Sequence, residues 1–121
     1  MDVADEVIGL EGSGWQALPA GGRAARAFYE EILNSRSVVM LLPGEMLLTD
    51  REQILDAMSG APWSSYELEQ PRVLQPAPDA AVVVYGVVAE RDGSSYSVLV
   101  ASLYVRRDAC WRLALHQQTP R

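Results

Sequence analysis

Residues 80–106 read AAVVVYGVVAERDGSSYSVLVASLYVR, and this stretch decides the fold. Two long runs, mainly of Val, Ala, Leu and Tyr, flank Asp92-Gly93, a dipeptide typical of a two-residue type I′ turn. β-Branched and aromatic side chains favour strands because they pack well on a pleated surface. The stretch therefore predicts an antiparallel hairpin of two long strands, at residues 80–91 and 95–106.

A two-residue turn would pair Arg91 with Ser94 and so fix the whole register of the hairpin. Tyr85 would then lie opposite Val100. Because side chains alternate between faces along a strand, one face carries hydroxyl groups among valines, on Tyr85, Tyr96, Ser102 and Tyr104. The other face is apolar throughout its centre, with Val82, Val84, Val88, Leu99, Ala101, Leu103 and Val105.

Both faces of the hairpin are thus apolar, which predicts that both are covered. An antiparallel sheet with one face in water alternates between polar and apolar side chains instead. The short helices that the rest of the chain predicts can cover only one face. We therefore expect a second copy of the chain on the other face, in a homodimer packed through the sheet.

One more strand is expected on each side of the hairpin. The strand at residues 66–74 contains Pro71, which indicates an edge position or a bulge because proline cannot donate a ladder hydrogen bond. A Pro-rich turn at residues 75–79 follows it. A turn near Asp108 leads to the last strand, at residues 110–118.

The length of that last turn decides which face carries His116. A two-residue turn at Asp108-Ala109 pairs Tyr104 with Leu113 and places His116 on the face opposite Tyr104. A turn one residue longer places His116 on the same face as Tyr104, because a one-residue slip moves every side chain to the other face. The sequence leaves both registers open.

The N-terminal half predicts two helices, at residues 2–18 and 23–33. Three glycines weaken the first, since each costs about 1 kcal/mol relative to Ala inside a helix. In the second, Ala24, Phe28 and Ile32 recur every four residues and define an apolar face.

Two short strands, at residues 37–42 and 45–48, precede a third helix at residues 50–59. Thr49 and Glu52 match a capping box, with Thr49 as the N-cap. The buried stripe of this helix is expected to consist of Ile54, Leu55 and Met58.

The expected order is α-α-β-β-α-β-β-β-β, with helices first and an antiparallel meander last. This order indicates the α+β class, with the helices on one face of one sheet. The chain has 121 residues, which is the length of a single domain, and we assign residues 1–121 to one.

Composition excludes several classes of function. The net charge is −6, from 16 acidic and 10 basic residues, which argues against nucleic acid because such binding rests on cationic side chains. All ten basic residues are Arg, so a lysine nucleophile and a lysine-containing phosphate loop are absent. One Cys and one His give neither a disulfide nor a four-ligand zinc site, and we expect no metal and no cofactor.

No targeting or membrane segment is evident in this sequence. The longest apolar run, residues 80–89, is half the length of about 20 residues that a membrane-spanning helix needs. There is no basic segment followed by an apolar one at the N-terminus. We therefore expect a cytoplasmic protein that does not bind membranes.

The hydroxyl-bearing face is the candidate site. Buried hydroxyls need hydrogen-bond partners, and several of them converging among valines are typical of a ligand pocket. Tyr85, Ser102 and Tyr104 are the candidate ligand-binding residues, and a plain core with satisfied hydroxyls is the alternative. Trp63, at the junction of the third helix and the sheet, would cover the mouth of the pocket or anchor the core.

His116 is the one candidate catalytic residue, because only its side chain has an ordinary pKa near neutrality. It could act as a general base. No Asp or Glu near it in sequence would orient its ring, and a lone histidine on a strand is more often a structural hydrogen-bonding residue.

Six segments together resemble a bacterial family of unknown function in the nuclear-transport-factor-2-like superfamily, also called cystatin-like or SnoaL-like. The resemblance spans residues 6–120, and the closing Trp-Arg-Leu-Ala-x-His-Gln-Gln-Thr-Pro run is its most specific part. The segments are Trp15-Gln16-Ala17-Leu18, Ala27-Phe28-Tyr29, Met40-Leu41-Leu42-Pro43-Gly44, Asp50-Arg51, Tyr104-Val105-Arg106-Arg107 and residues 111–120.

The resemblance implies a cone, in which a strongly curved mixed sheet wraps around three helices and encloses a pocket. It also implies a homodimer, which is common in this superfamily, and a bacterial source. The isomerase-like members place a carboxylate base just before a Pro-containing turn after the second helix. Here that stretch is Leu41-Leu42-Pro43, without an acid, which argues against enolisation by that mechanism.

Fold alone does not settle function in such a superfamily. The first hypothesis is a homodimer that is not an enzyme and binds a small apolar ligand in the cone. The second is a cyclase- or isomerase-like enzyme that uses His116 with tyrosine hydroxyls. The third is a structural or protein-interaction module whose cavity is filled by its own side chains.

Overall fold

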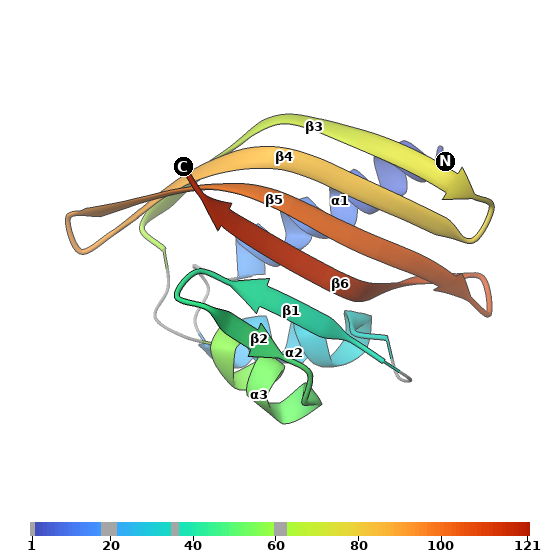
Figure 1. The fold of residues 1–121 in the computed structure, drawn as a ribbon, viewed down its shortest axis with the longest axis horizontal. Coiled ribbons are helices and arrows are strands. Elements are labelled where there is room, and N and C mark those ends of the chain that lie inside the picture. The colour runs from blue at the N-terminus through green and yellow to red at the C-terminus, as the bar shows by residue number, and fades with distance from the viewer. Residues whose placement is uncertain (1, 18–21, 35–36, 60–62) are drawn as a thin grey trace.

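A computed structural model describes residues 2–17, 22–34, 37–59 and 63–121 of the chain, and the elements follow the expected order (Figure 1). The described helices are α1 (Val3–Ala17), α2 (Gly22–Ile32) and α3 (Arg51–Met58). The described strands are β1 (Val39–Leu42), β2 (Met46–Leu48), β3 (Ser65–Ala77), β4 (Ala80–Arg91), β5 (Ser94–Arg107) and β6 (Cys110–Pro120).

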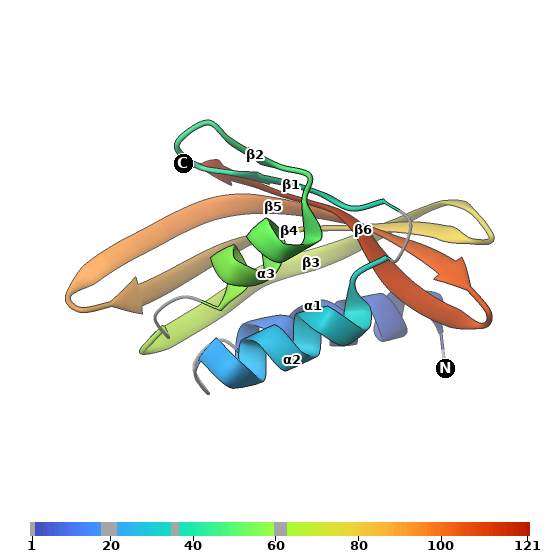
Figure 2. The same ribbon diagram turned by 90° about the horizontal axis from the view of Figure 1, so that it is seen from below.

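The strands form one open sheet in the order β2-β1-β6-β5-β4-β3. All neighbours are antiparallel except β1 and β6, which run parallel, so the sheet is mixed. The sheet is curved, and the three helices lie on one side of it (Figures 1 and 2). We call the side facing the helices the inner face and the other side the outer face. The architecture is the expected α+β cone.

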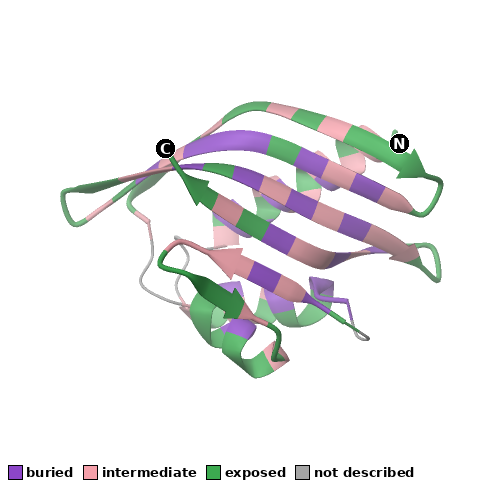
Figure 3. Ribbon diagram, in the orientation of Figure 1, coloured by how far each residue is buried: buried purple, intermediate pink, exposed green. Residues whose placement is uncertain are grey.

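The register of the β4–β5 hairpin is the predicted one. Arg91 pairs with Ser94, and Tyr85 pairs with Val100. Asp92 and Gly93 have positive φ angles of 52° and 78°, as a type I′ turn requires. The hydroxyl-bearing face is the inner face, and its residues are mostly buried. Figure 3 shows buried residues recurring along β4 and β5 between more exposed ones.

Strand β3 lies at the edge of the sheet and carries a bulge, so both consequences expected of Pro71 occur. The register with β4 shifts between Glu69 and Arg72. Within this bulge Gln70 has a φ of 47°. The bulge keeps Pro71 out of the ladder, where its missing N–H would otherwise leave an acceptor without a partner.

The position of His116 is decided by a bulge in β6 and not by the turn alone. The turn has two residues, and Tyr104 pairs with Leu113 as that turn predicts. The register then shifts, so that Ser102 pairs with His116 and Ala114 is the extra residue. The prediction that a two-residue turn puts His116 on the opposite face is therefore wrong, because the bulge reverses the alternation.

Two local predictions in the helices are also wrong. Ala24 is exposed, and the buried residues of α2 are Ala25, Tyr29 and Ile32. The buried stripe is thus shifted because α2 turns Tyr29 toward α1. The N-cap of α3 is Asp50, not Thr49, because the Asp50 carboxylate accepts the N–H of Gln53. The expected buried stripe of α3 is confirmed, with Ile54, Leu55 and Met58.

Candidate functional site

Two of the three predicted hydroxyl groups, those of Tyr85 and Tyr104, meet at α1. Tyr85, Ser102 and Tyr104 are at most 5% exposed, and all three lie on the inner face. Burial at this level leaves each hydroxyl dependent on protein partners. Those partners divide the three residues between two separate hydrogen-bond networks.

The first network centres on Glu11 of α1, a carboxylate that is only 6% exposed. Tyr85 donates its hydroxyl to Glu11 Oε2 at 2.6 Å, and Tyr104 donates to Oε1 at 3.2 Å. Trp15 Nε1 donates in turn to the Tyr85 hydroxyl oxygen at 2.8 Å. Each carboxylate oxygen thus has a donor, which is the condition under which a buried charge is tolerated.

Tyrosine hydroxyls in this cluster are held as neutral phenols. Burial raises the pKa of Tyr85 and of Tyr104 well above the ordinary value, and the negative charge of Glu11 raises both further. Tyr29 of α2 has a raised pKa for the same two reasons. Phenols in this state donate hydrogen bonds and do not act as bases near neutral pH.

Gly14 lets α2 approach this cluster. A Cβ at Gly14 would lie 2.6 Å from the Tyr29 hydroxyl, closer than real Cβ atoms come to other atoms. Three glycines weaken α1 as an isolated helix, and this one is needed for the packing of Tyr29 against it.

The second network runs through His116, which is 4% exposed. Ser102 Oγ lies 2.7 Å from His116 Nδ1, and Gln118 Nε2 lies 2.9 Å from His116 Nε2. The Tyr96 hydroxyl donates to Gln118 Oε1. An amide nitrogen can only donate, so His116 Nε2 accepts, and the ring proton is on Nδ1, where it bonds Ser102.

Burial lowers the pKa of His116, and the negative charge of Glu11 partly opposes that effect. The ring is therefore neutral near pH 7. Both of its nitrogens are engaged, neither of them by an acid. A general base needs an orienting partner and reach to a substrate proton, and here the ring holds Gln118 and Ser102 in place.

A pocket of about 260 Å³ opens beside these networks. We call it the aromatic pocket because three rings form one of its walls. Trp63 and Tyr96 stack with centroids 5.1 Å apart, and Trp15 lies 6.4 Å from Trp63. The guanidinium of Arg91 covers the Trp63 ring at 4.1 Å. The lining residues are Trp15, Leu42, Pro43, Met46, Ala57, Met58, Trp63, Arg91, Tyr96 and Gln118.

Of the predicted ligand-binding residues, only Trp63 lines this pocket. Tyr85 is separated from it by Trp15, which lines the pocket and bonds the Tyr85 hydroxyl. Ser102 reaches it only through His116 and Gln118. Tyr104 is bonded to Glu11 and is likewise absent from the lining.

Sequence reasoning missed Glu11 and Gln118. A signal for Glu11 exists, because Val7, Glu11 and Trp15 are spaced four apart and share a helix face, and all three are buried. An acid between two core residues on one face indicates a partnered buried charge. Gln118 gives no such signal, because its face depends on the bulge at Ala114.

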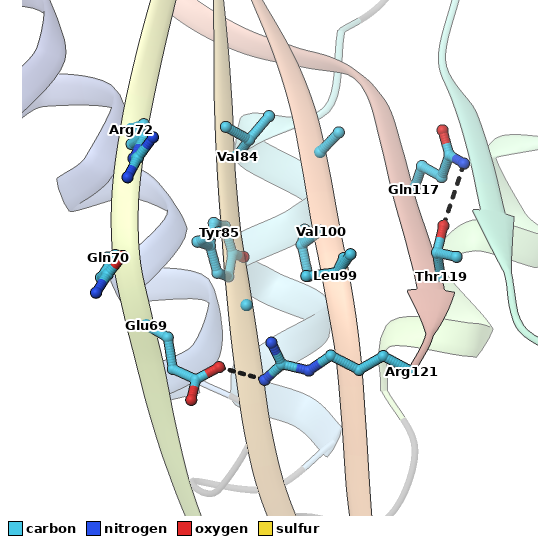
Figure 4. A pocket seen from close by; sticks show the side chains of 12 residues that line it. Glu69, Gln70, Arg72, Val84, Tyr85, Leu99, Val100, Gln117, Thr119 and Arg121 are labelled. Carbon is cyan, nitrogen blue, oxygen red and sulfur yellow. Dashed lines mark hydrogen bonds and ion pairs between the residues drawn. The ribbon is translucent and has the colours of Figure 1, made fainter.

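The outer face carries a second hollow, a groove of about 650 Å³ (Figure 4). Val84, Leu99 and Ala101 form its apolar part. Arg121 bonds Ser97 Oγ and pairs with Glu69 across the sheet, above Gly86. A Cβ at Gly86 would lie 2.6 Å from atoms of both partners, so a larger residue there would displace this ion pair from its position.

Within the described ranges, no helix is both long and apolar enough to span a membrane. The same part of the chain brings together no group of three or more Cys, His, Asp or Glu side chains suited to a metal ion.

Solved structures with this architecture are numerous. An NTF2-like protein from Cytophaga hutchinsonii has a TM-score of 0.82 at 14% identity, over 100% of both chains. A candidate ketosteroid isomerase from Parabacteroides distasonis has a TM-score of 0.81 at 17% identity, over 99% of this chain and 89% of the other. The association domain of C. elegans CaMKII has a TM-score of 0.76 at 14% identity, over 95% and 93%.

No family model and no curated protein matches the sequence. The three structures named above are each under 25% identical to this chain, so the likeness is one of fold, and it extends over nearly the whole chain. The expected resemblance is confirmed at that level: this chain has the nuclear-transport-factor-2-like (NTF2-like) fold.

Proposed function

We propose that this protein is a homodimer that binds a small apolar ligand in the aromatic pocket. The observation that carries the proposal is the lining, which consists of aromatic and aliphatic side chains with Arg91 and Gln118 as polar groups. A concave, mostly apolar site with a few placed polar groups is the usual form of a small-molecule site.

The geometry favours binding over catalysis by His116 and tyrosine hydroxyls. His116 is buried with both nitrogens bonded, and the hydroxyls of Tyr85 and Tyr104 point to Glu11. The lining of the aromatic pocket contains no Asp, Glu, His or Cys among the described residues. A ligand there would meet no group that exchanges protons readily near pH 7.

The outer face supports the homodimer. Leu47, Leu74, Val84 and Leu99 are each more than 40% exposed, and the sheet register places all four on this face. Soluble monomers rarely expose large contiguous apolar patches. The face also carries Glu69 beside Arg72 and Arg121, so a twofold axis could place opposite charges together. The association domain among the similar structures fits this assembly.

A thermal-shift screen of one- and two-ring apolar compounds tests ligand binding. Ala57 lines the pocket and is exposed, so Ala57→Trp should fill it and abolish stabilisation by any hit. Ala24→Trp, on an exposed position of α2, is the matched control and should leave the shift intact. A saturating ligand at 100 times its Kd raises stability by about 2.7 kcal/mol.

If no compound stabilises the wild-type protein, or if Ala57→Trp responds as the wild type does, the proposal is wrong. The first result would instead favour a protein-interaction module with a filled cavity.

A further inference from the structure

We infer that the aromatic pocket selects a flat aromatic molecule of one or two rings that bears a hydrogen-bond acceptor at one edge. This inference rests on the proposed function and names the class of ligand for the same site. Three observations support it: the volume of the pocket, the aromatic rings and methionines that line it, and the hydrogen bonds that fix the Gln118 amide.

The size of the pocket limits the ligand. Pockets that hold drug-sized molecules measure about 300–1,000 Å³, and the aromatic pocket measures about 260 Å³. Enlargement toward the core is blocked by Trp15, whose indole N–H is bonded to Tyr85. The space suits one or two fused rings and is too small for a four-ring steroid skeleton.

The walls favour an aromatic ring over a saturated one. One wall consists of Trp15, Trp63 and Tyr96, and Trp63 and Tyr96 are already stacked at an interplanar angle of 28°. Met46 and Met58 also line the space. Aromatic rings gain from edge and face contacts with other rings, and thioether sulfur makes favourable contacts with ring edges.

Gln118 supplies a donor whose direction is fixed. Its carbonyl accepts the Tyr96 hydroxyl, and one N–H is donated to His116 Nε2. The second N–H makes no hydrogen bond within the described part of the chain. His116 is held neutral and bonded to Ser102, so it acts as a positioning residue that keeps the amide from rotating.

The one charged side chain among the described lining residues, Arg91, carries hydrogen-bond donors and no acceptor. It lies over the Trp63 ring. The Gln118 amide therefore favours an acceptor on the ligand, such as a ring carbonyl, and Arg91 presents no acceptor that would compete with it.

Coumarin and naphthalene are suitable probes, because both are flat two-ring molecules and only coumarin has a carbonyl acceptor. Their Kd values are measured by calorimetry or tryptophan fluorescence with the wild type and with Gln118→Met, which keeps the length of the side chain and removes the donor. The variant should bind coumarin about fivefold more weakly, the effect of one neutral hydrogen bond. Naphthalene should bind both proteins within about twofold.

Naphthalene binding by the variant also reports that its pocket is folded. Should Gln118→Met lose both ligands, Tyr96→Phe serves instead, since it keeps a ring in the stack and frees the amide to rotate. Tyr96→Phe should weaken the binding of coumarin and leave the binding of naphthalene unchanged. trans-Decalin, a saturated two-ring molecule, should bind the wild type more weakly than naphthalene.

Three results would overturn the inference. The amide is not a recognition group if coumarin and naphthalene lose affinity equally in both Gln118→Met and Tyr96→Phe. The same holds if neither variant binds coumarin more weakly than the wild type does. If decalin binds as tightly as naphthalene, the pocket does not select aromatic rings. In each case naphthalene binding by the wild type leaves the proposed function standing. Absence of binding by every probe contradicts both.

Discussion

At the scale of single residues, the centre of the molecule is organised around one buried acid. Glu11 brings a carboxylate into the core, where the Tyr85 and Tyr104 hydroxyls donate hydrogen bonds to it. Trp15 donates in turn to the Tyr85 hydroxyl. Removing one partner of a buried charged group leaves a desolvated charge, which costs more than the hydrogen bond itself gains. The two tyrosines differ in their contacts, which makes the cluster testable.

We expect Tyr85→Phe to destabilise the protein by about 1–3 kcal/mol, because it removes the donor to Glu11 Oε2 and the acceptor of Trp15 Nε1. Tyr104→Phe removes only a 3.2 Å bond to Glu11 and should cost less. Urea unfolding at pH 7 measures both free energies. Equal losses for the two variants would contradict this account of the cluster.

His116 should make the protein sensitive to acid. Its pKa is lowered in the folded state, so between the ordinary value of about 6.5 and that lower value the unfolded chain binds a proton that the native one does not. The associated stability is present above pH 6.5 and is lost as the pH falls. Between pH 7.5 and 5.5 the loss is at most about 1.4 kcal/mol, the value of one pKa unit.

Urea unfolding at the two pH values measures this loss. His116→Gln cannot titrate, and its stability should change less between pH 7.5 and 5.5 than that of the wild type. A loss of the same size in the variant would assign the acid sensitivity to other groups.

At the scale of elements, two strand bulges and one tight turn shape the sheet. The bulge at Gln70 and Pro71 lets β3 continue along the sheet edge, and the bulge at Ala114 turns His116 and Gln118 inward. The β5–β6 turn places Ala109 at a φ of 64°. An L-residue in this left-handed region is strained, whereas glycine is not.

Ala109→Gly should therefore stabilise the protein. Relief of a strain of roughly 1–2 kcal/mol is partly offset by the greater freedom of glycine in the unfolded chain, which costs about 0.4–1 kcal/mol. The net gain in the free energy of unfolding should be about 0.5–1 kcal/mol, measured by urea unfolding. Ala109→Val should be destabilising, and a loss of stability in Ala109→Gly would show that the turn is not strained.

At the scale of the whole molecule, the helices cover one face of the sheet and leave the other open (Figure 2). The exposed leucines and valines of the outer face lie on β2, β3, β4 and β5, so the apolar surface extends across most of the sheet. Burying such a surface against a second copy removes it from water on both subunits at once.

Leu99→Glu should dissociate the proposed homodimer, because Leu99 is 51% exposed in the outer groove and the variant would place a charge in the apolar interface. Light scattering at micromolar concentration should give twice 13.3 kDa for the wild type and the single-chain mass for the variant. Ala24→Glu, on the exposed side of α2, is the control and should stay dimeric. A wild-type mass near 13.3 kDa would refute the homodimer.

The sequence by itself determined the element order, the β4–β5 register and the apolar character of both sheet faces. These follow from local causes: Asp92-Gly93 selects a turn type, and the alternation along each strand then assigns Tyr85, Ser102 and Tyr104 to one face. The third helix, with its N-terminal cap, and the edge position of the strand that contains Pro71 also follow from local sequence.

Only the tertiary structure decided where the candidate site lies. Glu11 meets Tyr85 and Tyr104 across 74 and 93 residues of sequence, and no local pattern carries such a contact. The bulge at Ala114 changes the face of Gln118, because one extra residue reverses the alternation of a strand. Whether a hydroxyl lines a pocket or satisfies a buried acid therefore depended on how α1 packs on the sheet.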